Sequence, residues 1–121
     1  MAYRAPTTEI QFALMQEAGF QRLIDSGKFE DLSDDLLDAI LEEAAKLATD
    51  VIAPASWDGD QKGCQLSEDG VKVPESFKQA YTKYVEGGWP SLRASAHFGG
   101  QAAPTVLGTA VEEIWGGSNL G

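Results

Sequence analysis

The sequence contains little of the chemistry from which active sites are usually built. Its 121 residues include one cysteine, Cys64, and one histidine, His97. A single cysteine cannot form a disulfide within the chain, and one thiol does not make a metal site. A free thiol suits a reducing compartment.

Long apolar runs are also missing. No segment approaches the roughly 20 apolar residues that a membrane-spanning helix requires. The first residues lack the apolar core of a signal peptide. We therefore expect a soluble, cytoplasmic protein without a membrane span.

Basic residues are few as well. The chain has 9 Lys and Arg against 19 Asp and Glu, which gives a formal net charge of −10. The basic residues are scattered singly along the sequence, and an acidic surface repels phosphate. Nucleic acid and anionic lipid are therefore unfavourable partners.

His97 would have to serve in any catalytic dyad or triad that uses histidine. It lies between Ala96 and Phe98 in a glycine-containing loop, with no nucleophile elbow nearby. We interpret it as an ordinary loop histidine.

The segment 58–69 resembles a calcium-binding loop, beginning with Asp58 and carrying Asp69 at its twelfth position. The resemblance fails at the ligands. Lys62 occupies a liganding position, the twelfth residue should be a bidentate Glu, and Gln65 replaces an apolar residue. We interpret the segment as a solvated turn.

Two further patterns have structural explanations. The paired glycines of Phe98-Gly99-Gly100-Gln101 precede a helix but lack the spacing of a dinucleotide-binding motif, so a tight turn explains them better than an anion site. The pairs Glu42-Glu43 and Glu112-Glu113 are typical of exposed helix faces. We assign no catalytic, cofactor-binding or metal-binding residue.

Apolar residues recur at helical spacing in three segments, which predicts an all-α protein. The first helix is predicted to be capped by Ser33 and stopped by Pro54. A loop, 57–70, follows. The second helix runs from Pro74 to Gly87-Gly88, and a loop, 89–103, leads to a third helix from Pro104 to Gly116-Gly117.

The third helix has only two charges, Glu112 and Glu113, and so needs cover on more than one side. Phe77, Tyr81 and Trp115 are interpreted as packing residues. We expect the helices to cover the third helix poorly, so that it and Trp115 expose apolar surface through which the chain associates with itself.

The first thirty residues are less regular. Ile10, Phe12 and Leu14 alternate as in a strand, whereas the spacing of Thr8 and Gln11 fits a helical capping box. We favour a helix there and a further helical turn at 20–24.

The order of several short motifs resembles the N-terminal α-domain of the acyl-CoA dehydrogenase family. In chain order these motifs are Ala53-Pro54, Trp57-Asp58 with Gly63, Val73-Pro74-Glu75-Ser76-Phe77, Glu86-Gly87-Gly88-Trp89, Phe98-Gly99-Gly100-Gln101 and Glu112-Glu113-Ile114. The opening Tyr3-Arg4-Ala5-Pro6 is similar to the short extension of larger bacterial members. Ala102 departs from the family, whose turn usually has glycine there; a positive φ would strain alanine.

The resemblance implies an incomplete antiparallel helical bundle: an extension at 1–30 and the family's N-terminal helical domain at 31–121, truncated at its C-terminal end. The parent enzyme would oxidise an acyl-CoA to the 2,3-enoyl-CoA in fatty acid metabolism, with FAD as hydride acceptor, an electron-transfer flavoprotein downstream and a homo-oligomeric state. In the family the catalytic base and the flavin site lie in later domains. The fragment is therefore expected to bind no FAD and to be inactive, contributing helical scaffold and part of the acyl-tunnel wall.

The alternative is a complete small acidic helical protein that binds a partner through an apolar face and has no enzymatic activity. An acyl-carrier role is less well supported, because no attachment serine stands in the required context. Acyl-chain length, the electron acceptor and the oligomeric state are not encoded in any motif of this segment.

Overall fold

The computed structural model describes residues 2–121 and is mostly helical. The predicted all-α class is confirmed, with one small two-stranded hairpin added. The helices are α1 (Thr7–Phe12), α2 (Phe20–Asp25), α3 (Asp34–Leu47), α4 (Ala53–Lys62), α5 (Glu75–Glu86) and α6 (Thr105–Ser118), and the strands are β1 (Gln65–Ser67) and β2 (Gly70–Lys72).

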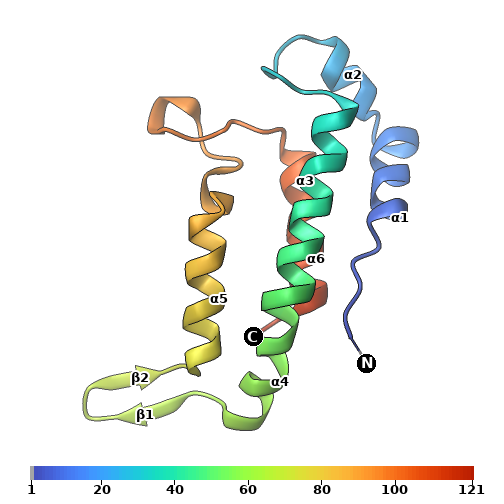
Figure 1. The fold of residues 1–121 in the computed structure, drawn as a ribbon. Coiled ribbons are helices and arrows are strands. Elements are labelled where there is room, and N and C mark those ends of the chain that lie inside the picture. The colour runs from blue at the N-terminus through green and yellow to red at the C-terminus, as the bar shows by residue number, and fades with distance from the viewer. Residues whose placement is uncertain (1) are drawn as a thin grey trace.

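The helices form an open bundle around α3 and α6 (Figure 1). The chain runs in one direction along α3 and α6 and in the opposite direction along α1 and α5, with α1 and α5 on opposite sides of the central pair. The hairpin of β1 and β2 extends from the end where α4 meets α5. Its antiparallel register pairs Leu66 with Val71.

The core lies between α1, α3 and α6. Burial of apolar side chains stabilises it, and its large, fully enclosed members come from α2, α3 and α6. The largest of these side chains are Phe20, Leu37, Leu41, Leu107 and Ile114. Ile10 and Leu14 complete the core from the N-terminal side, so the first thirty residues belong to the same packed unit.

The first predicted helix begins as expected but does not stop at Pro54. Ser33 caps α3, and its Oγ accepts the N–H of Leu36 at 3.1 Å. A π-helical turn, Ala48–Ile52, then joins α3 directly to α4, so residues 57–62 are helical rather than part of a loop. Pro54 sits in the first turn of α4, where a missing N–H is tolerated.

Three other boundaries also differ from the prediction. Pro74 and Pro104 each precede their helix rather than open it. The α6 helix continues through Gly116 and Gly117 to Ser118, so the predicted stop there was wrong. The second helix does end at the glycine pair, where Gly88 adopts the left-handed conformation (φ 76°).

The helix predicted near the N-terminus is confirmed as α1, followed by a π-helical turn, Ala13–Glu17, and the turn at 20–24 is confirmed as α2. The capping box was wrong, because Pro6 precedes α1 and no side chain caps it. Residues 2–6 precede α1 without regular secondary structure, and Tyr3 Oη donates to the carbonyl of Ile114 at 3.2 Å.

Candidate functional site

The single histidine lies apart from any cluster of reactive groups. His97 is exposed in a short 3₁₀ turn, where its ring packs edge-to-face against Phe98, with 4.8 Å between the centroids. The backbone N–H of His97 donates to Ser95 Oγ, which caps that turn. The hydroxyl of Ser95 is thus engaged with the backbone rather than with the imidazole ring, and the interpretation of His97 as a loop residue agrees with its surroundings.

The segment that resembles a calcium loop is partly helical. Asp58 and Asp60 belong to α4, whereas Asp69 lies in the hairpin turn. Lys62 Nζ lies 2.6 Å from Asp58 Oδ1, and Ser76 Oγ donates to Asp58 Oδ2 at 2.5 Å. These hydrogen bonds, the one from Lys62 first, hold the pKa of Asp58 below its ordinary value. Asp58 therefore fastens α4 to the start of α5.

Metal ligands are not assembled in the part of the chain that the structure describes. Within residues 2–121, no group of three His, Cys, Asp or Glu side chains is placed to hold a metal ion. In the same range, no helix is long and apolar enough to cross a membrane. Cys64 is exposed.

The paired glycines before α6 form a tight turn. Gly99 is left-handed (φ 81°), and a Cβ on Gly100 would lie 2.0 Å from the carbonyl oxygen of Ala94. The backbone at Gly100 is therefore packed against Ala94 and is not open to an anion. Ala102, two residues later, has a φ of 51°, so the positive φ considered for this position is confirmed.

The paired carboxylates point to separate surroundings. Glu112 accepts a hydrogen bond from Arg93 Nη1 at 2.9 Å. Glu113 lies near Tyr3 instead, and the pKa of Tyr3 is raised first by burial of its phenol and then by the negative charge of Glu113. Glu42 and Glu43 are exposed on α3. Neither pair forms an acid–base dyad.

The most distinctive surface surrounds α5. We call its apolar side the α5 stripe, which consists of Phe77, Ala80, Tyr81, Tyr84 and Val85. None of the residues of α5 is buried, and 66% of Tyr81 and 45% of Val85 are exposed. The prediction that Tyr81 packs in the core was therefore wrong. The least covered helix is α5 rather than α6, which buries six residues.

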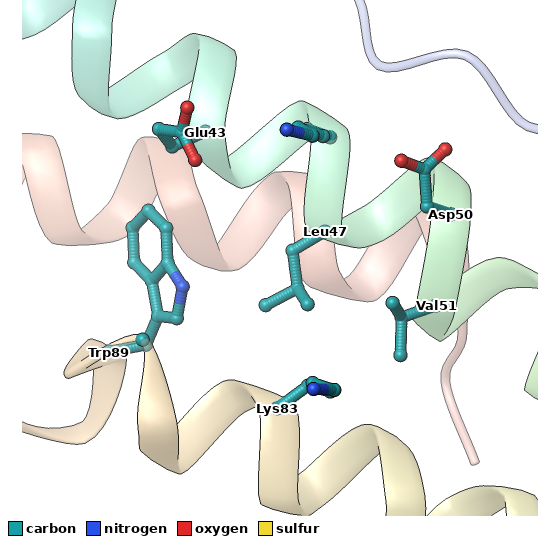
Figure 2. A pocket seen from close by; sticks show the side chains of 8 residues that line it. Glu43, Leu47, Asp50, Val51, Lys83 and Trp89 are labelled. Atoms are coloured by element: carbon teal, nitrogen blue, oxygen red, sulfur yellow. The ribbon is translucent and has the colours of Figure 1, made fainter.

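One hollow separates α5 from α3 (Figure 2). Leu47 and Val51 point from the α3 side toward α5, and Trp89 closes one end. The hollow has a volume of about 230 Å³ and carries Glu43, Lys46, Asp50 and Lys83 around its apolar floor. Its mixture of charges gives no preference for a ligand of one sign.

A second hollow, which we call the α5–α6 groove, lies on the other side of α5. It has a volume of about 290 Å³, and the residues that line it are Ile52, Phe77, Ala80, Tyr81, Tyr84, Trp115, Asn119 and Gly121. The lining contains no charged side chain. The groove can therefore accept apolar groups but offers no nucleophile, base or oxyanion donor for a reaction.

Aromatic rings form one wall of this groove. Tyr84 and Trp115 meet edge-to-face at 6.0 Å, and Trp115 meets Trp89 in the same way at 5.1 Å. Burial, and then the charge of Glu112, raises the pKa of Tyr84. Trp115 is half-buried by these contacts and is less exposed than predicted.

Sequence patterns identified the α5 stripe but missed its neighbours. Trp89 follows a glycine pair in a loop, and Ile52 lies in the π-helical turn. Asn119 donates from Nδ2 to the carbonyl of Ile52 at 3.4 Å across 67 positions of sequence. The bulky residue after Gly87-Gly88 was the one sequence feature that could have pointed to Trp89. No sequence feature pointed to Asn119.

Comparison with known proteins places the chain beside one group of enzymes. No family model matches. The chain is 35% identical over 114 residues to 3-methylmercaptopropionyl-CoA dehydrogenase from Ruegeria pomeroyi. It is 27% identical over 119 residues to a broad-specificity linear acyl-CoA dehydrogenase from Mycobacterium tuberculosis. It is 31% identical over 84 residues to butyryl-CoA dehydrogenase from Syntrophomonas wolfei. These matches cover 94%, 97% and 66% of this chain but 19%, 20% and 14% of the relatives. The chain thus spans at most about a fifth of the length of the relatives that it matches.

Proposed function

Because the chain is homologous over nearly its whole length to the N-terminal region of acyl-CoA dehydrogenases, we propose that it is the N-terminal helical part of an FAD-dependent enzyme of that family. The observation that carries this proposal is the disparity in coverage. The alignment takes in 94% of this chain and 19% of the first relative. Such a match is what one domain of a longer enzyme produces.

The proposed parent enzyme oxidises an acyl-CoA thioester to the 2,3-enoyl-CoA. The three relatives differ in the acyl group that their names specify, but each name specifies a CoA thioester or a linear acyl-CoA. The proposal therefore covers the thioester class and leaves the acyl chain open. Electron-transfer flavoprotein as acceptor, a homo-oligomeric state and a cytoplasmic location belong to the same proposal.

Within that enzyme, residues 31–121 form the N-terminal helical domain and residues 1–30 an extension to it. These residues provide a helical scaffold and part of the wall that surrounds the acyl chain of the substrate in the parent enzyme. The uncharged lining of the α5–α6 groove supports a wall of this kind. The segment alone is proposed to be inactive, because we find no nucleophile, base and oxyanion donor assembled among residues 2–121.

The described residues do not fit FAD. The glycine turn before α6 is packed against Ala94, and Pro104, which precedes α6, offers no N–H to a pyrophosphate. The α5–α6 groove of about 290 Å³ lies at the small end of ligand sites and has no positively charged side chain to face a pyrophosphate. We therefore place the flavin in the remainder of the parent protein.

One observation favours the second candidate, a complete helical protein that binds a partner. The α5 helix has an apolar stripe and no buried residue, as expected of a surface that another protein covers. The reading frame separates the candidates, since a stop codon after Gly121 would favour the partner-binding protein.

The decisive experiment compares the visible absorption spectrum of this chain with that of the longest chain its gene encodes. We expect a colourless segment and a yellow full-length protein. The yellow colour should bleach with one member of a series that includes butyryl-CoA, longer linear acyl-CoA thioesters and 3-methylmercaptopropionyl-CoA, and persist with free CoA. A full-length protein without flavin, or one that no thioester reduces, would contradict the proposal.

A further inference from the structure

The chain contains the dipeptide Asp-Gly twice, in two different structural settings. Asp58-Gly59 lies within α4, and Asp69-Gly70 lies at the tip of the hairpin formed by β1 and β2. In an Asp-Gly pair the backbone nitrogen of the glycine can attack the side-chain carboxyl of the aspartate, because glycine has no Cβ to shield that nitrogen. The attack closes a five-membered ring, so it requires a backbone that is free to rotate.

The hairpin restrains Asp69 only weakly. Each of its strands has three residues, and residues 65–72 are all exposed to solvent. The side-chain hydrogen bond across the turn joins Ser67 Oγ to the carbonyl of Gly70 at 3.1 Å and does not involve the Asp69 carboxyl. A two-stranded hairpin without other support is marginally stable in water, so this turn opens readily.

The turn also requires glycine at position 70. Gly70 has a φ of 111°, a value at which a residue with a Cβ would be strained. A Cβ built on Gly70 would meet nothing within 4 Å, so the surroundings leave room for a ring to form. The conformation of the hairpin therefore places the reactive glycine directly after Asp69.

The fold restrains the other pair, Asp58-Gly59, in two ways. Lys62 Nζ lies 2.6 Å from one carboxyl oxygen of Asp58, and Ser76 Oγ donates to the other oxygen. Gly59 is held in the helical conformation of α4, and a Cβ on it would lie 2.5 Å from Phe77 Cζ. The carboxyl and the nitrogen of this pair are therefore both fixed by their partners.

We propose that Asp69 is a site of spontaneous isomerisation to isoaspartate in the native protein, and that α4 protects Asp58 from the same reaction. The Gly70 nitrogen forms a bond to Asp69 Cγ and loses its proton, and the carboxyl hydroxyl leaves with that proton as water. Water then adds to the main-chain carbonyl of the resulting succinimide and breaks its bond to the Gly70 nitrogen. No further reactant is needed. The proposal goes beyond the proposed function, because both pairs lie within the 121 residues.

Isomerisation changes the shape of the hairpin. In isoaspartate the main chain passes through Cβ and Cγ of residue 69, which lengthens the turn by one carbon atom and leaves a free α-carboxylate. Ser67 pairs with Gly70 across this turn, and Leu66 pairs with Val71 beside it. Because the length of the turn fixes the register of a hairpin, the longer turn disturbs both pairs. The modification therefore alters a surface that projects from the helical bundle (Figure 1).

The test uses the longest chain that the gene encodes, incubated in mildly acidic buffer with and without concentrated urea. Trypsin cleavage after Lys46, Lys62 and Lys72 separates the two pairs, because peptide 47–62 carries Asp58 and peptide 63–72 carries Asp69. Mass-spectrometric fragmentation measures isoaspartate in each peptide. The incubation continues until both peptides from the urea sample contain isoaspartate, which sets the time scale. Asp69→Glu is the matched control, since it keeps the charge and disfavours the ring.

In the native protein we expect isoaspartate to form at least about tenfold faster at Asp69 than at Asp58, because Asp58 reacts only after local opening of α4. In urea the two rates should agree within about threefold, because neither backbone is then held in its native conformation. Asp69→Glu should remove isoaspartate from peptide 63–72 and leave peptide 47–62 unchanged.

Three outcomes would overturn the inference. Equal native rates would show that α4 gives no protection. A tenfold ratio that persists in urea would assign the difference to neighbouring residues rather than to the fold. Isoaspartate that is absent from native peptide 63–72 would show that the hairpin is held rigid or covered. None of these outcomes concerns flavin or thioester, so the proposed function is tested separately.

Discussion

Ala102 is a single residue that carries backbone strain, because it occupies a position of positive φ where glycine would be favoured. Its φ of 51° lies in the left-handed region, which costs an alanine roughly 1–2 kcal/mol and glycine little. The turn around it is fixed by backbone contacts, since the Ala102 N–H donates to the carbonyl of Ala94 at 2.9 Å. The strain is therefore retained rather than relaxed.

We expect Ala102→Gly to stabilise the protein by about 0.5–1 kcal/mol, because the relief of backbone strain outweighs the greater freedom of glycine when unfolded. The midpoint of urea unfolding should rise with an unchanged slope. Ala96→Gly is the matched control, since Ala96 is exposed and has no positive φ, and should be neutral or destabilising. A lower midpoint for Ala102→Gly would contradict this account.

At the scale of an element, the long helical run through Pro54 shows why a local rule failed. Proline was predicted to end the helix because it cannot donate to the preceding turn. The π-helical turn before it makes the Ala53 N–H donate to the carbonyl of Ala48, five residues back. This shift of register places Pro54 at the start of a new α-helical segment. The signal needed to foresee it lies in how α3, α4 and α5 pack together.

Two helical glycines differ in the space available for a side chain, one being tightly packed and the other open, and they give a pair of contrasting predictions. A Cβ on Gly59 of α4 would lie 2.5 Å from Phe77 Cζ, whereas a Cβ on Gly116 of α6 would meet only Leu120 Cδ2 at 3.6 Å. Gly59→Ala should destabilise the protein by about 1–3 kcal/mol, because the Phe77 ring and α5 must move.

The matched variant, Gly116→Ala, should be stabilising by about 0.5–1 kcal/mol, because alanine favours the helical backbone and has room. Urea unfolding of both variants measures the difference. Stabilisation by both substitutions would show that Phe77 moves without cost and would contradict the close packing of α4 on α5.

At the scale of the molecule, the N-terminal extension and the helical domain share one core. Phe20 is fully buried, and Ile10 and Leu14 are 6% and 5% exposed. They pack with residues of α3 and α6 in a single cluster. The extension is therefore part of the packed unit on which the stability of the domain depends.

Removing residues 1–30 should abolish the cooperative unfolding transition. The three buried side chains contribute about 1.5–3 kcal/mol each, against a total stability of about 5–15 kcal/mol for a typical domain. Circular dichroism during heating measures the effect. Tyr3→Phe, which removes only the hydrogen bond to Ile114, should keep the transition. A shortened chain that unfolds cooperatively at the original midpoint would contradict the shared core.

The sequence by itself determined the helical class, the cap at Ser33 and the glycine stop after α5, because each depends on residues close together in the chain. The order and spacing of the motifs also resembled the acyl-CoA dehydrogenases, and the chain matches three such enzymes over 66% to 97% of its length. The tertiary structure decided the rest. It continued the first helix past Pro54, placed Tyr81 on the surface and built the α5–α6 groove from Ile52, Trp115 and Asn119. Such features depend on contacts between distant segments, and local propensity carries no information about which of those segments will meet.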